Sequence, residues 1–182
     1  MKYGLPMSVE GNGTEYAIRS DYRDVLTIIE ALSDAELTDE DKAEVMLDIF
    51  YPDFLDMPQS DYEEAVHQCV IFINGGKESK NSKSSPKLMD WQQDFPIIVA
   101  PLNRVLGKEI RAEKYIHWYT LLSAYSEIGD CTFAQVVAIR SKKARGKKLD
   151  KAEQEFYRNN RDLVDFERAY TPKDEAIISR WI

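Results

Sequence analysis

Histidine and cysteine are the residues of this chain best suited to chemistry, and there are only two of each. His67 and Cys69 lie two positions apart in a segment with helical periodicity, so they point to different sides and cannot form a catalytic or metal-binding pair. His117 precedes Trp118, and Glu113 is the only acidic residue three or four positions away from it. Such a histidine could support acid–base chemistry, but hydrogen-bonded packing requires no further partner. We interpret His117 as structural and predict no catalytic residue.

The acidic clusters and the glycines match no metal or phosphate site. Asp39-Glu40-Asp41 and Glu63-Glu64 fall in the first turns of predicted helices, where the helix dipole accounts for acidic residues. The sequence lacks the alternating Asp or Asn pattern of a calcium loop. Glu78 follows Gly76-Lys77 at the place where a phosphate-binding loop has Ser or Thr. The sequence therefore predicts a protein that is not an enzyme and needs neither metal nor cofactor.

A basic stretch at 140–151 offers the clearest alternative, which is nucleic-acid binding. It holds seven Lys or Arg residues, and such cations attract phosphates in a salt-dependent way. The candidate contacts are Lys142, Lys143, Lys147 and Lys148. No helix-turn-helix, zinc or RNP pattern accompanies them, so a solvated connection is the simpler interpretation.

Charge is divided unevenly along the chain. Residues 1–64 contain 17 acidic and 4 basic side chains, whereas residues 65–182 contain 15 acidic and 20 basic ones, and the net charge is −8. This asymmetry favours pairing within the chain or between subunits.

Composition limits the class of protein. The chain is 43% hydrophobic, with 8 Gly and 7 Pro among 182 residues, which excludes collagen-like, low-complexity and disulfide-stapled proteins. No apolar run approaches the roughly 18 residues that cross a bilayer, and polar sequence follows the first methionine instead of a signal-peptide core. Two separated cysteines fit a reducing compartment. We expect a soluble protein that stays where it is made.

The elements expected from periodicity are one hairpin and a series of helices. Residues 5–18 read as two short strands around Gly11-Asn12-Gly13, a turn that favours positive φ. Three-four spacing of apolar residues predicts the helices. They are expected from Ser20, from the N-cap Thr38, from a Ser60–Glu63 capping box, and over 88–106 (kinked by Pro96 and Pro101), 114–129, 132–140, 149–166 and 171–182. The fold class is all-α, a compact bundle of about seven helices with a short N-terminal β hairpin.

The polar run at 75–87 contains no apolar residue and suggests how the chain divides into parts. We expect an acidic N-terminal part at 1–74, a flexible linker or loop at 75–87, and a helical C-terminal part at 88–182 that packs with the first part as one domain.

Several segments resemble the gene-product-fifteen family of bacteriophages and prophages of Gram-positive hosts. They are LPMSVEGNGTEYAIRSDYRDVL, Asp90-Trp91-x-x-Asp94, YIHWYTLLSAYSEIGD and VVAIRSKKARGKKLDKAEQEFYRNNRDLVD. The resemblance runs from the hairpin to about residue 166. Its most specific part is His117-Trp118-Tyr119, followed by Ile139-Arg140 and the lysine-rich turn.

The resemblance implies a tail assembly chaperone. Such a protein binds the long, largely apolar and helical tape measure protein and keeps it soluble while the tail tube assembles. A further implied partner is the tail tube protein, without membrane contact. The charge asymmetry, and not the resemblance, suggests a homo-oligomer. The implied location is the host bacterial cytoplasm during assembly, with absence from the mature virion. Aromatic residues dominate the energetics of interfaces, so we select Trp91, Tyr119 and Tyr125 as partner-binding candidates.

Overall fold

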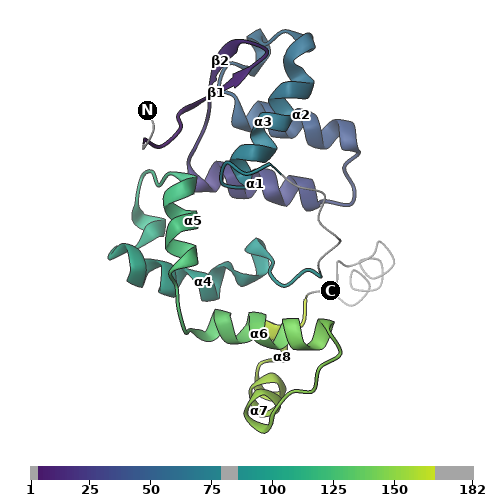
Figure 1. Cartoon of the computed structure of the whole chain (residues 1–182), viewed down its shortest axis with the longest axis vertical. Helices are drawn as coiled ribbons and strands as arrows, with labels where there is room; N and C mark the ends of the chain where they lie inside the picture. Colours follow the sequence, from purple (N-terminus) through teal and green to yellow (C-terminus); the bar gives the residue numbers. More distant parts are fainter. Residues whose placement is uncertain (1–3, 79–85, 167–182) are drawn as a thin grey trace, which may run out of the picture. The chain divides into compact units, whose positions relative to one another are not determined.

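A computed structural model describes residues 4–78 and 86–166 of the chain (Figure 1). The prediction of a mainly helical fold with one N-terminal hairpin is confirmed, because the described residues form eight α-helices and one two-stranded sheet. The chain divides into two compact units. Unit 1 comprises Met1–Ser85 and Ile97–Cys131, and unit 2 comprises Pro86–Pro96 and Thr132–Ile182. Among the described residues, no helix is long and apolar enough to span a membrane.

The hairpin of unit 1 pairs β1 (Ser8–Gly11) with β2 (Thr14–Ala17) in an antiparallel ladder. Asn12 and Gly13 form its turn with φ angles of 51° and 81°. Positive φ at both central positions is the requirement of the tight turns that suit twisted strands, so the Asn-Gly prediction is confirmed.

Two antiparallel helices follow the hairpin. Helix α1 (Tyr22–Ser33) begins at Asp21, whose carboxylate accepts from the Arg23 amide. Helix α2 (Asp39–Phe50) begins at the expected Thr38, which forms a capping box with Asp41. A capping box satisfies two backbone N–H groups that the helix itself leaves unpaired. The helices bury an apolar core against each other and against α3; it includes Val25, Ile28, Met46, Leu47, Phe50 and Phe72.

The start of α3 differs from the prediction. Two 3₁₀ turns, η1 (Phe54–Asp56) and η2 (Gln59–Asp61), precede α3 (Tyr62–Ile73). The Ser60 hydroxyl donates to Asp61 at 3.1 Å, so the expected Ser60–Glu63 capping box is wrong. The 3₁₀ turn brings the Asp61 carboxylate to Tyr16 and Asn12 of the hairpin. The tertiary contact therefore replaces the local cap.

The second part of unit 1 begins inside helix α4, at Ile97. Helix α4 (Trp91–Leu106) runs through both prolines and is followed by η3 (Ile110–Ala112) and α5 (Trp118–Ser126). The helix expected over 114–129 is too long at its N-terminal end, because Asp21 and His117 form a β-bridge. The Tyr22 amide donates to Ile116 O at 3.0 Å within that contact. This pairing holds the residues before α5 extended.

Unit 2 contains α6 (Thr132–Ala144), α7 (Lys151–Asn159) and α8 (Arg161–Val164). The single helix expected over 149–166 is wrong, because Asn160, with φ −137° and ψ 45°, interrupts it. Ala152 of α7 is exposed, and Val164 of α8 is buried. The interruption turns the chain so that α8 packs on α6.

Two expectations lie outside the described residues. They are most of the linker expected at 75–87, of which residues 79–85 are not described, and the helix expected over 171–182. Both stay predictions.

Candidate interaction surfaces and a buried ion pair

His117 holds an extended N-terminal segment against the start of α5. Its side chain is buried, and its Nδ1 accepts from the Tyr119 amide at 3.0 Å, which makes it the N-cap of α5. Because Nδ1 accepts, the ring proton is on Nε2, which lies 2.9 Å from the Pro6 carbonyl oxygen and donates to it. The Phe72 ring packs at 5.7 Å between centroids. The structure thus gives this histidine two hydrogen bonds and an aromatic contact.

We expect His117→Asn to retain the cap and lose the Pro6 contact. The shorter asparagine side chain accepts from the helix N-terminus as a normal N-cap but does not reach Pro6. The lost hydrogen bond and ring packing should lower the free energy of unfolding by about 1–3 kcal/mol, and His117→Ala, which also removes the cap, by about 1 kcal/mol more. Urea unfolding followed by circular dichroism measures both changes. Equal losses in the two variants would contradict the capping role.

Three exposed apolar side chains gather where this segment crosses the residues before α5. Leu5, Met7 and Tyr115 have exposed fractions of 51%, 55% and 47%, and we call them the strap patch. The Tyr115 hydroxyl lies 3.6 Å from the Met7 sulfur and 2.7 Å from the hydroxyl of the buried Ser20. The segment is fixed on both sides of Met7, because Met7 O also accepts from the Ile18 amide at 3.1 Å. Sequence reasoning missed this patch, since Met7 and Tyr115 are 108 positions apart.

The aromatic candidates selected from the sequence are all partly buried. Trp91 is at the start of α4, in unit 2, whereas Tyr119 and Tyr125 lie on α5 in unit 1. The Tyr119 ring stacks on Phe72 with centroids 4.9 Å apart, and burial raises the pKa of Tyr119. A charge at Tyr119 would therefore disturb the core of unit 1 as well as any partner contact. Their role in binding stays a prediction.

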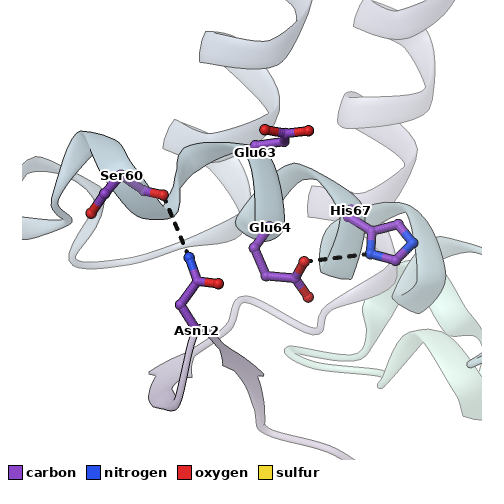
Figure 2. A pocket seen from close by; sticks show the side chains of 5 residues that line it. All are labelled: Asn12, Ser60, Glu63, Glu64 and His67. Carbon is purple, nitrogen blue, oxygen red and sulfur yellow. Dashed lines mark hydrogen bonds and ion pairs between the residues drawn. The ribbon is translucent and has the colours of Figure 1, made fainter.

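An acceptor-rich hollow of about 470 Å³ lies between the hairpin turn and α3. Figure 2 shows Glu64 turned toward His67, whose Nδ1 is 3.7 Å from the carboxylate, and Asn12 reaching the Ser60 carbonyl oxygen at 3.4 Å. A hydrogen bond from Tyr16 lowers the pKa of the neighbouring Asp61. Within the described ranges, no group of three His, Cys, Asp or Glu residues could hold a metal ion. The hydrogen bonds of this region join the hairpin to η2, the 3₁₀ turn that precedes α3.

An ion pair between Arg140 and Asp94 is buried inside unit 2. The Arg140 Nη1 and Nη2 donate to the two Asp94 oxygens at 2.6 and 2.9 Å, and the side chains are 3% and 1% exposed. Asp94 also accepts from the Asp90 amide at 2.9 Å. The Phe166 ring covers the guanidinium, with its centroid 4.1 Å from Cζ. A bidentate pair of this kind fixes geometry as well as charge.

The remaining guanidinium donors bind backbone carbonyl groups. Nε donates to Val164 O at 2.8 Å, Nη2 to Leu163 O at 2.8 Å, and Nη1 to Leu88 O at 3.2 Å. All five N–H groups of Arg140 are thus satisfied. The pair connects α6, the end of α8, the start of α4 and the residue stretch before α4.

The family follows from a comparison with known protein families, because the model described as Bacteriophage Gp15 protein matches residues 1–166. The chain belongs to the bacteriophage Gp15 family. The resemblance drawn from the sequence is therefore confirmed. No curated protein and no solved structure matches the chain. The Gp15 match spans the strap patch, the hollow and the buried ion pair.

The basic stretch of this Gp15 family member is partly neutralised. Arg140 is buried, so it is not a surface cation as the sequence suggested. Lys142 pairs with Glu153 at 2.5 Å, and Lys143 pairs with Asp165 at 2.5 Å. Lys147 and Lys148 are exposed. Two of the four lysines selected as nucleic-acid contacts are therefore engaged inside unit 2, and the nucleic-acid role itself stays a prediction.

Proposed function

We propose that this protein is a non-enzymatic tail assembly chaperone that binds the tape measure protein and keeps it soluble in the host cytoplasm during tail tube assembly. The Gp15 family match over residues 1–166 is the observation that carries the proposal. A tape measure protein is a long chain of largely apolar helix. Before the tube encloses it, its helix faces would associate with each other. A chaperone for such a client needs binding surfaces and no reacting groups.

Exposed apolar side chains on a rigid support favour this role. The strap patch offers three of them in unit 1: Leu5 and Met7 on either side of Pro6, and Tyr115, whose hydroxyl contacts the Met7 sulfur. Its backbone is held by the Pro6–His117 and Met7–Ile18 hydrogen bonds. An apolar helix face binds to such an area through its own apolar side chains. In our proposal the strap patch is the first contact of the client within unit 1.

Co-expression tests the proposal. The expected result is that the tape measure protein encoded near this chain in the phage genome is insoluble alone. It becomes soluble and co-purifies when this protein is present, because its helix faces are covered. A centrifuged lysate and a pull-down through a tag on this chain measure both effects. An unrelated helical protein expressed at the same level is the control. A client that stays insoluble, or that is soluble without ever co-purifying, would contradict the proposal.

A further inference from the structure

The two compact units carry opposite charges. Unit 1 contains 22 Asp and Glu against 11 Lys and Arg, a net charge of −11, whereas unit 2 contains 10 against 13, a net charge of +3. Net charge alone affects solubility and association without specifying a partner. The positions of the exposed charges indicate which surfaces could form the contact.

The acidic residues of unit 1 include a stripe along α2. Glu40, Glu44 and Asp48 are spaced four apart, so they lie on one face of the helix, and all three are exposed. The opposite face contributes Met46 and Leu47 to the core. Like charges at this spacing destabilise a helix, and no described cation forms an ion pair with the three residues. We call them the α2 acidic stripe. Its length is about 12 Å at 1.5 Å per residue.

Four exposed cations of unit 2 lie together at the turn between α6 and α7. They are Arg145, Lys147, Lys148 and Lys151, and we call them the basic loop. Gly146, with φ 64°, ends α6 in a Schellman motif, in which the Lys147 amide donates to Lys142 O at 2.9 Å. This motif fixes the backbone of the turn. In the described chain, no carboxylate forms an ion pair with the basic loop, in contrast to Lys142 and Lys143.

We propose that the basic loop of one copy docks on the α2 acidic stripe of a second copy. Charge complementarity carries the proposal, because among the described residues neither surface has an ion-pair partner of the opposite sign and each would supply it to the other. The proposal goes beyond the proposed function and requires no client. Contact between two different surfaces is heterologous, so repetition produces a ring or an open chain of copies.

A protein partner fits the basic loop better than nucleic acid does. The whole chain has a net charge of −8, which opposes the approach of a polyanion. Carboxylates of Asp150, Glu153 and Asp165 lie in the same small unit and bind its neighbouring groups. The repulsion between two acidic copies is screened beyond the Debye length of about 8 Å at physiological salt, whereas charges in direct contact are screened less.

Charge reversal at the two surfaces tests the proposal. The loop variant combines Lys147→Glu with Lys148→Glu, and the stripe variant combines Glu44→Lys with Asp48→Lys. All four side chains are exposed, and none caps a helix. Light scattering or sedimentation should show species of the wild type heavier than the 21.0 kDa chain. Each variant alone should weaken self-association at least tenfold, because contact pairs become repulsive.

An equimolar mixture of the two variants is the decisive measurement. Each has one normal and one reversed surface, so the mixture restores opposite charges at every contact, and self-association should return. Contact within one chain could not be restored by mixing. The matched control is Lys114→Glu with Arg158→Glu, which lowers the net charge from −8 to −12 as the loop variant does and should associate as the wild type.

Three results would overturn the proposal. The first is a wild type that stays monomeric at about 100 µM in 50 mM salt, and the second is a mixture that does not associate more than its components. The third is binding of a single-stranded oligonucleotide that the loop variant loses while its self-association is unchanged. Circular dichroism confirms that the variants are folded, and the milder Lys147→Gln with Lys148→Gln provides a second test at the same loop. None of these measurements contains the client, so failure here is distinguishable from failure of the chaperone proposal.

Discussion

Arg140→Met should lower the stability of unit 2 by about 3–5 kcal/mol, since it removes one member of a buried ion pair and leaves the other uncompensated. Asp94 is 1% exposed, so water cannot replace the lost guanidinium. Three carbonyl oxygens, those of Leu88, Leu163 and Val164, lose a donor at the same time. Hydrogen exchange of the α6 amides measures the change within unit 2, and urea unfolding measures it for the whole chain.

The double variant Arg140→Met with Asp94→Leu separates the value of the pair from the penalty of an unpaired charge. Replacing a buried ion pair by apolar side chains of similar volume is often neutral, so the double variant should recover much of the loss. Arg140→Lys should lie in between, because a lysine has three donors and cannot form the bidentate contact. Arg158→Met is the control at an exposed arginine and should change stability by less than about 0.5 kcal/mol. An Arg140→Met protein as stable as this control would show that the pair is not needed for unit 2.

The helix that carries Arg140 can be predicted from the sequence, but the ion-pair partner of Arg140 cannot. The sequence places Arg140 on the same three-four stripe as Phe133 and Val136, and that position indicates burial. The six further Lys or Arg residues that follow within eleven positions instead group it with the surface cations. Asp94 lies 46 positions away, and no local pattern reports a pairing at that distance. The position of an arginine on an apolar stripe is the signal that could have found it.

Sequence signals for helix caps and turns predicted the structure correctly where the residues themselves stabilise the element. They failed where hydrogen bonds to distant parts of the chain compete with the local structure. Thr38 caps α2 with its own side chain, and Asn12-Gly13 form the hairpin turn through their own positive φ angles. The predicted N-cap and the predicted turn are both confirmed. The helix expected from residue 114 begins at Trp118 because the preceding residues pair with the segment at Asp21. His117 is an unusual N-cap, since Ser, Thr, Asp and Asn are the preferred residues. The strap patch depends on the same long-range pairing, which explains why the sequence did not indicate it.

Leu5→Asp combined with Met7→Asp should weaken binding of the tape measure protein by about 30-fold or more. That factor corresponds to roughly 2 kcal/mol, the usual loss when a central apolar contact of an interface is removed. Both side chains are about half exposed. The backbone hydrogen bonds of the segment use the Pro6 and Met7 main-chain oxygens, so the substitutions remove only the weak contacts of the Met7 sulfur with the Ser20 and Tyr115 hydroxyls. The substitutions should therefore leave the fold intact while placing two carboxylates against an apolar helix face. Co-purification yield and a binding curve with the purified client measure the loss.

The matched control is Leu55→Asp combined with Val105→Asp, which introduces the same charge at two other exposed apolar residues of unit 1, with exposed fractions of 92% and 38%. If apolar exposure alone attracted the client, both double variants would lose binding equally, because each removes two apolar side chains from the surface. If the strap patch is the docking area, the control should bind as the wild type. Binding that survives in the strap variant and is lost in the control would place the client contact near Leu55 or Val105. Only a selective loss in the strap variant supports client docking where the N-terminal segment crosses the residues before α5.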